Sequence, residues 1–365
     1  MTIEAWTQAG LYDAAAPDAA GRLELLQFLA EQGCSIDEMV AAHARGRLFA
    51  LAGDRLIRPD RDRYDLHELA EMLDQPLERV RAVWRAFGLV DIGDKVASPD
   101  DVEMMRTTLA MAEFLGLDAT IGLSRVIGSS LARIGDATSA AVRTRFPSMT
   151  LAVSGSEVRT ATSFAALAGT VPALGRLVDT LLRHHLENAR MHFERTDSDD
   201  VVREGGIRLS VGFADLCGFT GITQRLRMDE LSQLMSGFET VAADVVADHG
   251  GRVVKFIGDA VMFVTPDPVS AVAAAEDLVV AAEIRDLQAR AGVAAGTVLA
   301  LDGDYFGPVV NLAARLVSIA EPGDVLASET VIEWLGDRRE SESLGMRSIR
   351  GFDDPVPVAR LARTR

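Results

Sequence analysis

The feature that most constrains this 365-residue chain is a change of hydrophobic pattern near Gly206. Before that point apolar residues recur at helical spacing, most clearly from Ala173 to Arg195. After it, short apolar runs typical of strands alternate with amphipathic helices. A chain of this length suits two domains, each with its own core. We therefore predict an all-helical domain over residues 1–195, a polar linker over 196–205 and an α+β domain over 206–365.

The order of elements after Gly206 predicts the topology of the second domain. Strands are expected at 207–216, 252–257, 260–264 and 293–301, and helices at 228–249, 268–285 and 309–319. This βαββαβ order is ferredoxin-like and predicts a mostly antiparallel sheet with helices on one face. Because the first strand then pairs with the third, residues at their adjoining ends lie close together.

Composition excludes several classes of function. The net charge is −17, and both halves are acidic, so neither carries the basic surface that nucleic acid or anionic lipid selects. No apolar run approaches the ~20 residues that a membrane-spanning helix needs, and the N-terminus lacks the pattern of a secretory signal. Two distant cysteines, Cys34 and Cys217, suit a reducing compartment. We expect a cytoplasmic protein with no membrane partner.

Two carboxylates follow apolar strands of the predicted sheet. Asp215 ends the first strand, and Asp259 lies at the tip of the Gly258–Asp259 hairpin. Each alone has an ordinary explanation, since Asp215 could cap a helix and Asp259 could be a turn residue. Two adjacent carboxylates repel unless a cation holds them, and hard oxygen ligands suit Mg²⁺ or Mn²⁺. Together the pair predicts a site for a divalent cation.

Lys255 stands out because only two of the 37 basic residues are lysine. It lies in an apolar strand, where strict alternation would point it away from Val254 and Phe256. Either it is a solvated cation on an exposed strand face, or it donates to a bound ligand, which we prefer. Asn311 and Arg315 are four residues apart on one predicted helix and therefore lie on the same face of it.

The acid before that helix, Asp304, lies in a predicted turn. An Asn–Arg pair beside an acid could form a surface network or a phosphate clamp.

Four segments in order together resemble the class III adenylyl and guanylyl cyclases. They are FADLCGFT (213–220), GGRVVKFIGDAVMF (250–263), GDYFGPVVNLAARL (303–316) and SIRGF (348–352). The resemblance covers Gly206 to about Arg365 and implies a class III cyclase domain.

The resemblance also implies roles for single residues. Asp215 and Asp259 match the family's metal-binding aspartates, which hold two Mg²⁺ or Mn²⁺ ions in each active site. Asn311 and Arg315 match its transition-state residues, and Arg350 stands where the family has a basic residue on the triphosphate.

Lys255 and Asp304 match the pair that reads adenine, which implies ATP as substrate and cyclic AMP as product. Guanylyl cyclases usually carry Glu and Cys or similar residues there. A guanylate or relaxed-specificity cyclase is the first alternative, and a regulator that only binds nucleotide is the second. Since the family builds its site between two catalytic domains and this chain fills every position, the resemblance implies a homodimer with two sites at its interface.

The helical half resembles the N-terminal autoregulatory domain of soluble mycobacterial cyclases. Its segment Asp65–Gly88 also looks like a helix-turn-helix with Arg79, Arg81 and Arg85 on the second helix. We interpret it as a packing motif rather than a DNA reader, because the surrounding half is acidic.

Three histidines, His184, His185 and His192, lie on the helix that joins the two halves. Histidine changes charge at physiological pH, so acidification could shift the chain toward an active arrangement. The alternative is that they only line a solvated helix face.

Overall fold

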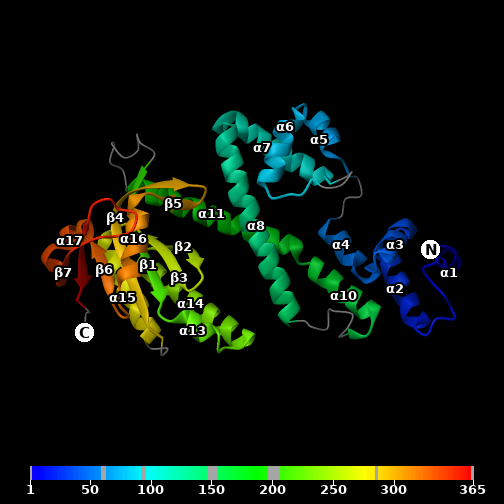
Figure 1. The fold of residues 1–365 in the computed structure, drawn as a ribbon. Coiled ribbons are helices and arrows are strands. Elements are labelled where there is room, and N and C mark those ends of the chain that lie inside the picture. Colours follow the sequence, from blue (N-terminus) through cyan, green and yellow to red (C-terminus); the bar gives the residue numbers. More distant parts are fainter. Residues whose placement is uncertain are drawn as a thin grey trace. The chain divides into compact units, whose positions relative to one another are not determined.

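The computed structural model describes residues 2–58, 63–91, 96–145, 154–195, 206–283 and 287–362. The backbone forms two compact units, Met1–His185 and Leu186–Arg365. Helix α11 (Val171–Arg195) extends across the division between them. The predicted linker at 196–205 lies outside the described residues. Figure 1 shows helices in the first unit and a sheet with helices in the second, which confirms the α+β fold class.

The helices of the first unit begin and end close to the residues that the sequence favours. Their bounds are α1 (Ile3–Gln8), α2 (Ala19–Glu31), α3 (Ile36–Ala44), α4 (Leu51–Ile57), α5 (Leu66–Leu73), α6 (Leu77–Ala86), α7 (Pro99–Leu115), α8 (Leu117–Arg145) and α10 (Glu157–Ala168). Ser35 caps α3: its side chain accepts from the Glu38 backbone N–H, and the Glu38 carboxylate accepts from the Ser35 N–H. These helices pack around two apolar cores, one centred on Leu25 and Leu29 and the other on Leu69.

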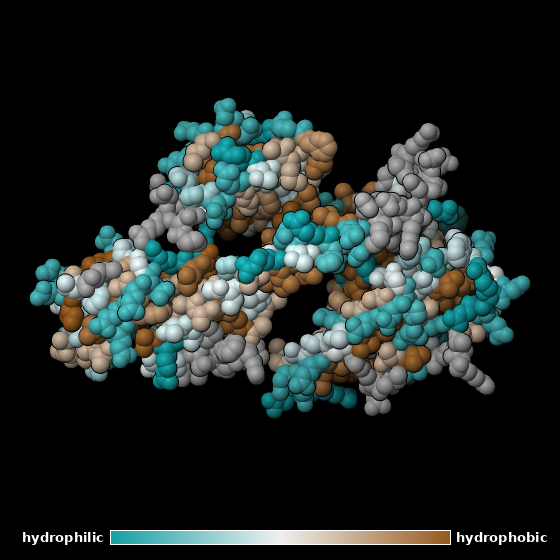
Figure 2. All heavy atoms as spheres, turned by 180° about the vertical axis from the view of Figure 1, so that it is seen from behind, coloured by the Kyte–Doolittle hydropathy of each residue, from teal (hydrophilic) through white to brown (hydrophobic). Residues whose placement is uncertain are grey.

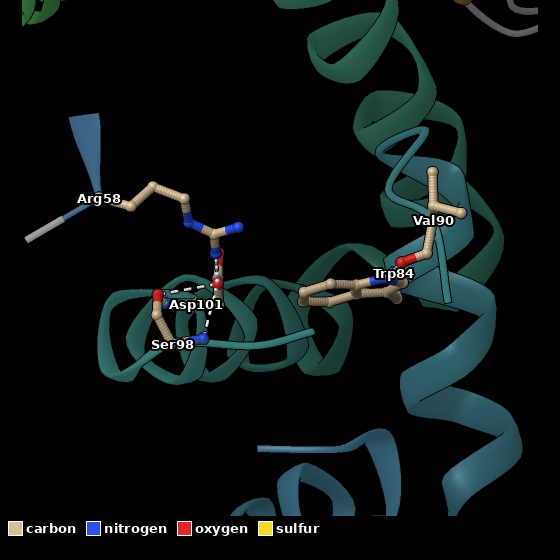
Figure 3. Close-up of polar contacts among 5 residues, drawn as sticks. All are labelled: Arg58, Trp84, Val90, Ser98 and Asp101. Atoms are coloured by element: carbon tan, nitrogen blue, oxygen red, sulfur yellow. Dashed lines mark hydrogen bonds and ion pairs between the residues drawn. The ribbon is translucent and has the colours of Figure 1, made fainter. Parts of the chain in front are cut away.

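A polar contact joins the helices of the two cores (Figure 3). The Asp101 carboxylate accepts from Arg58 Nη2 at 2.5 Å and from the Ser98 backbone N–H and hydroxyl at 2.8 Å each. In the same view the Trp84 indole N–H donates to the Val90 carbonyl at 3.2 Å. One carboxylate therefore caps the start of α7 and also holds the residue that follows α4.

Large apolar side chains are exposed along α8 and α11. They are Leu123, Ile127, Leu131 and Ile134 on α8, and Leu177, Leu181, Leu182 and Leu186 on α11. Figure 2 shows brown hydrophobic atoms among teal hydrophilic ones over the visible face of the molecule. By length and composition alone, the helical stretch Glu157–Ala189 could cross a membrane, a criterion that is weak for a single helix. The expected lack of a membrane partner therefore stays a prediction.

The second unit contains one mixed sheet with helices on both faces. The strands are β1 (Gly206–Leu216), β2 (Arg252–Ile257), β3 (Ala260–Thr265), β4 (Ala289–Leu301), β5 (Asp304–Phe306), β6 (Val325–Ser328), β7 (Ser341–Arg347) and β8 (Val356–Leu361). The helices are α13 (Phe219–Thr223), α14 (Met228–Asp248), α15 (Pro268–Glu283), α16 (Pro308–Ile319) and α17 (Glu329–Leu335). The strand order is β2-β3-β1-β4-β6-β8-β7, with β5 beside β4. As predicted, the first strand pairs with the third.

The prediction of helices on only one face is wrong. On β1, Ala214 and Leu216 face the core that contains residues of α14, α15 and α17. Val211 and Phe213 face the opposite core, which contains residues of α16. The connection from β4 to the parallel strand β6 runs through α16, and this crossover covers the second face.

Helix α16 lies directly on β4. A Cβ atom at Gly292 would come within 2.7 Å of the Ala313 carbonyl oxygen, the Leu316 Cβ and the Val317 nitrogen. Only a residue without a side chain permits this approach, so Gly292 fixes the distance between helix and sheet.

A bulge in β2 corrects the predicted direction of Lys255. The pairing with β3 shifts register between Val253 and Lys255, and Lys255 lies opposite Met262. Val254 and Met262 contribute to the core beneath α16, whereas Phe256 contributes to the opposite one. Lys255 therefore points away from Phe256, as strict alternation predicts, but shares the α16 face with Val254, because the extra residue of a bulge breaks the alternation.

Candidate active site

The sheet makes Asp215 and Asp259 neighbours. Asp215 lies near the end of β1, opposite Ala260 of β3, which directly follows Asp259. Gly258 has a φ of 63°, which gives the tight hairpin, and the Leu216 N–H donates to the Asp259 carbonyl at 3.2 Å. The tip of the hairpin is thus attached to the end of β1.

Sequence reasoning missed Arg290, which holds Asp215. Arg290 of β4 lies opposite Asp215 in the β1–β4 register. Its Nε and Nη2 donate to Asp215 Oδ2 at 3.2 and 2.9 Å. Both side chains are largely buried, with 29 % and 20 % of their surfaces exposed. An arginine two residues before Gly292 in an otherwise apolar strand was the signal in the sequence.

The charges of this cluster act on one another. Burial raises the pKa of the Asp259 carboxyl, its own backbone N–H lowers it, the charge of Asp215 raises it and that of Arg290 lowers it. Burial also raises the pKa of the Cys217 thiol, with Arg290 opposing the two aspartates there. A thiol kept protonated is a poor nucleophile, so this raised pKa gives no support to a nucleophilic role for Cys217.

The donor set suits a hard divalent cation only in part. Among the described residues no cluster of three or more His, Cys, Asp and Glu side chains forms a complete metal site. Two carboxylates are nevertheless the number that Mg²⁺ sites commonly use when water and substrate phosphates complete the shell. Asp215 Oδ2 already accepts two bonds, and within the described part of the chain Oδ1 has no recorded partner. The residues therefore fit a cation that is shared with a phosphate substrate.

Lys255 and Asp304 form an ion pair between β2 and β5. Lys255 Nζ donates to Asp304 Oδ2, and the backbone N–H of Tyr305 donates to Asp304 Oδ1 at 2.8 Å. The predicted turn at Asp304 is a short strand, Asp304–Phe306, paired with the end of β4. Both charged side chains remain partly exposed, at 37 % and 25 %, so a ligand can reach them.

Asn311 and Arg315 are both exposed on α16. Leu316 and Val317 of the same helix are buried against the sheet and hold it in place. For the residues that the structure describes, no ion pair is recorded for the Arg315 guanidinium, which leaves it available to an anion.

Arg350 lies apart from these groups in the backbone. It is exposed in the turn between β7 and β8, next to the buried Ile349. Within the described part of the chain, it forms no hydrogen bond or ion pair with the other predicted site residues.

The structure brings the predicted residues together in two groups, the acids with Arg290 and the Lys255–Asp304 pair. Asp215 and Arg290 lie on the α16 face of the sheet, as Lys255 does. Asn311 and Arg315 stand on the helix above that face. The individual roles of these residues remain predictions.

Comparison with known proteins identifies both halves. Residues 7–190 match the family described as the adenylate cyclase regulatory domain. Residues 204–356 match the family described as the adenylate and guanylate cyclase catalytic domain.

Relatives align with nearly the whole chain. An uncharacterised protein of Mycobacterium bovis is 42 % identical over 344 residues, covering 93 % of this chain and 90 % of its own. A pH-sensitive adenylate cyclase of Mycobacterium tuberculosis is 32 % identical and covers 94 % and 88 %. The crystal structure of an adenylyl cyclase from P. aeruginosa is 26 % identical, covering 43 % of this chain and 95 % of its own with a TM-score of 0.41. This chain belongs to the class III adenylate and guanylate cyclases, with an adenylate cyclase regulatory domain ahead of its catalytic domain.

Proposed function

We propose that the protein is an adenylate cyclase, which converts ATP to 3′,5′-cyclic AMP and pyrophosphate. The observation that carries this proposal is the ion pair between Lys255 and Asp304. A lysine donor beside a carboxylate acceptor complements the adenine edge, where N1 accepts and the 6-amino group donates. The name of the mycobacterial relative, a pH-sensitive adenylate cyclase, supports the same substrate.

The reaction is an intramolecular phosphoryl transfer. The ribose 3′-oxygen attacks the α-phosphorus, and pyrophosphate leaves in line. Asn311 orients the ribose, and Arg315 offsets charge that develops on the α-phosphate oxygens. Arg350 contacts the triphosphate, and Asp215 and Asp259 would hold two Mg²⁺ or Mn²⁺ ions. Bound there, the ions would lower the pKa of the 3′-hydroxyl and neutralise phosphate charge.

Specificity for ATP can be tested at the ion pair. Replacing Lys255 with Ala, or Asp304 with Ala, should lower kcat/KM for ATP by at least about 100-fold, because a site built to hydrogen-bond a base loses its partner. Kinetics with ATP and with GTP in parallel would check this. Equal losses for both nucleotides would show that the pair does not read the base and would favour a cyclase of relaxed specificity.

We propose further that two copies of the chain form a homodimer with an active site at each end of the interface. Besides the exposed Asn311 and Arg315, the β4–β5 arm supports this arrangement. Its apolar side chains Leu299, Leu301 and Phe306 are 46 %, 52 % and 46 % exposed beside Asp304. Exposed apolar surface next to ligand-binding groups is typical of an interface.

In this proposal the helical domain regulates the catalytic one by restraining it. DNA binding has little support, because Arg79 pairs with Glu113 and both Arg81 and Arg85 pair with Asp91. We also propose a cytoplasmic location.

A response to pH is a separate hypothesis. His184 and His185 are exposed on α11, near the ion pair of Asp179 with Arg183, while the side chain of His192 lies outside the described residues. Replacing all three histidines with Gln should flatten the dependence of activity on pH between 6 and 8, since α11 then carries no imidazole whose charge can change. A curve that keeps its shape in the full-length variant would rule out this switch.

A further inference from the structure

Arg290 contacts two parts of the candidate site at once. Two of its N–H groups meet on one oxygen, Asp215 Oδ2, at 3.2 and 2.9 Å. The third direction of the guanidinium is used as well, because Nη1 donates to the Ala320 carbonyl at 3.2 Å. Ala320 is the C-cap residue of α16, the helix that carries Asn311 and Arg315.

This geometry restrains the aspartate. A planar guanidinium bonded at two corners to one oxygen and at a third to a backbone carbonyl has little freedom to rotate. The pairing of β1 with β4 places Asp215 and Arg290 opposite each other. The backbone of Asp215 is therefore fixed by the sheet, and its Oδ2 is fixed by Arg290. Its other oxygen, Oδ1, is left for a ligand.

The same contact places a fixed positive charge beside the acid pair. Arg290 is the cation whose charge acts on both Asp259 and Cys217, so its field covers the whole cluster. A divalent cation on Asp259 and on Oδ1 of Asp215 would therefore be opposed by this charge. The fixed orientation of Asp215 favours binding of the cation, whereas the positive charge of Arg290 weakens it.

We propose that Arg290 is a positioning residue that orients Asp215 for metal binding and weakens the affinity of the acid pair for a free divalent cation. Binding of the cation to Asp215 and Asp259 then depends on the phosphates of the nucleotide, which bring compensating negative charge. This inference rests on the proposed metal role of Asp215 and Asp259.

The test separates charge from geometry with two variants. Arg290→Met removes the charge and roughly keeps the length of the side chain. Arg290→Lys keeps the charge but lacks the planar guanidinium with its several N–H donors. Arg339→Met is a matched control, because Arg339 forms a comparably buried ion pair with Glu276 at 2.6 Å elsewhere in the same unit. Free Mn²⁺ is measured by electron paramagnetic resonance with the full-length chains, with and without a non-cyclisable ATP analogue.

We expect Arg290→Met to bind Mn²⁺ about tenfold more tightly without nucleotide, at the lower end of what one neighbouring charge does to a partly buried site. Its kcat should fall by about 10- to 100-fold, as for other lost outer-shell partners. Arg290→Lys should keep the wild-type Mn²⁺ affinity without nucleotide and still lose kcat. Arg339→Met should change neither quantity.

The outcomes distinguish this inference from the function on which it rests. Equal or weaker Mn²⁺ binding in Arg290→Met would overturn the role of its charge, and full kcat in Arg290→Lys would overturn the role of its geometry. Were Asp259→Asn to bind Mn²⁺ as the wild type does, with nucleotide or without, the metal role itself would fail. Circular dichroism identifies a variant that has not folded, and the lysine variant then carries the test.

Discussion

Replacing Asp259 with Asn is expected to lower kcat for cyclic AMP formation by at least about 100-fold, because a lost metal ligand matters at least as much as a lost outer-shell partner. The same substitution should stabilise the protein in EDTA. Burial and the charge of Asp215 both disfavour the ionised form of this carboxyl, and an amide of the same shape removes that penalty. A carboxylate that destabilises the fold is consistent with the proposed metal-binding role of Asp259.

The sign of the pH dependence follows from the direction of the pKa shift. An acid whose pKa is raised by folding binds its proton more tightly in the folded state, so the wild type loses stability as pH rises above the usual value of 3.8. Asp259→Asn should therefore exceed the wild type in Tm at pH 7, and the difference should shrink as pH falls toward 3.8.

Thermal unfolding with EDTA and with Mn²⁺ checks both parts. Mn²⁺ should raise the Tm of the wild type and not that of the variant, since a ligand stabilises only the state that binds it. An inactive variant that is less stable than the wild type in EDTA would indicate structural damage instead. Asp277→Asn, at an exposed carboxylate bonded to His249, serves as the control.

Mixing two inactive chains should restore activity. An Asp259→Asn chain lacks a proposed metal ligand and an Arg315→Ala chain lacks the proposed transition-state cation, whose loss alone should lower kcat by roughly 10²–10³-fold. If each site takes its metal ligands from one chain and Arg315 from the other, a mixed dimer has one intact site. Random assortment of equal amounts then gives about one quarter of the wild-type activity.

The matched control uses two variants from the same side of the site. Mixing Asp215→Asn with Asp259→Asn chains leaves every site with a damaged acid pair, so activity should stay at background. Co-expression of each pair, followed by assays at constant total protein, gives the activity of both mixtures. Recovery in both mixtures, or in neither, would contradict a site shared between chains in this way.

Much of the fold was predictable because its signals are local. The helix stripes and the hairpin at Gly258–Asp259 depend on neighbours in sequence, and the structure confirms them. The acids could be placed together because strand pairing follows from the order of the elements.

The misses came from effects that local patterns do not encode. The bulge before Lys255 depends on the register with β3, and the position of α16 on the second face depends on a crossover to a parallel strand. Arg290 escaped attention because its partner lies 75 residues away in sequence and becomes a neighbour only through the β1–β4 pairing.

The contact at Gly292 limits how such an enzyme can be switched. Backbone atoms of α16 lie against β4 with no side chain between them, so the helix cannot slide or tilt without a clash. Asn311 and Arg315 are therefore fixed in the frame of their own sheet, and a regulatory signal cannot reset them one by one. In the proposed homodimer, control of catalysis would then fall to rigid-body movement of one whole catalytic domain against its twin, which would open or close both sites together.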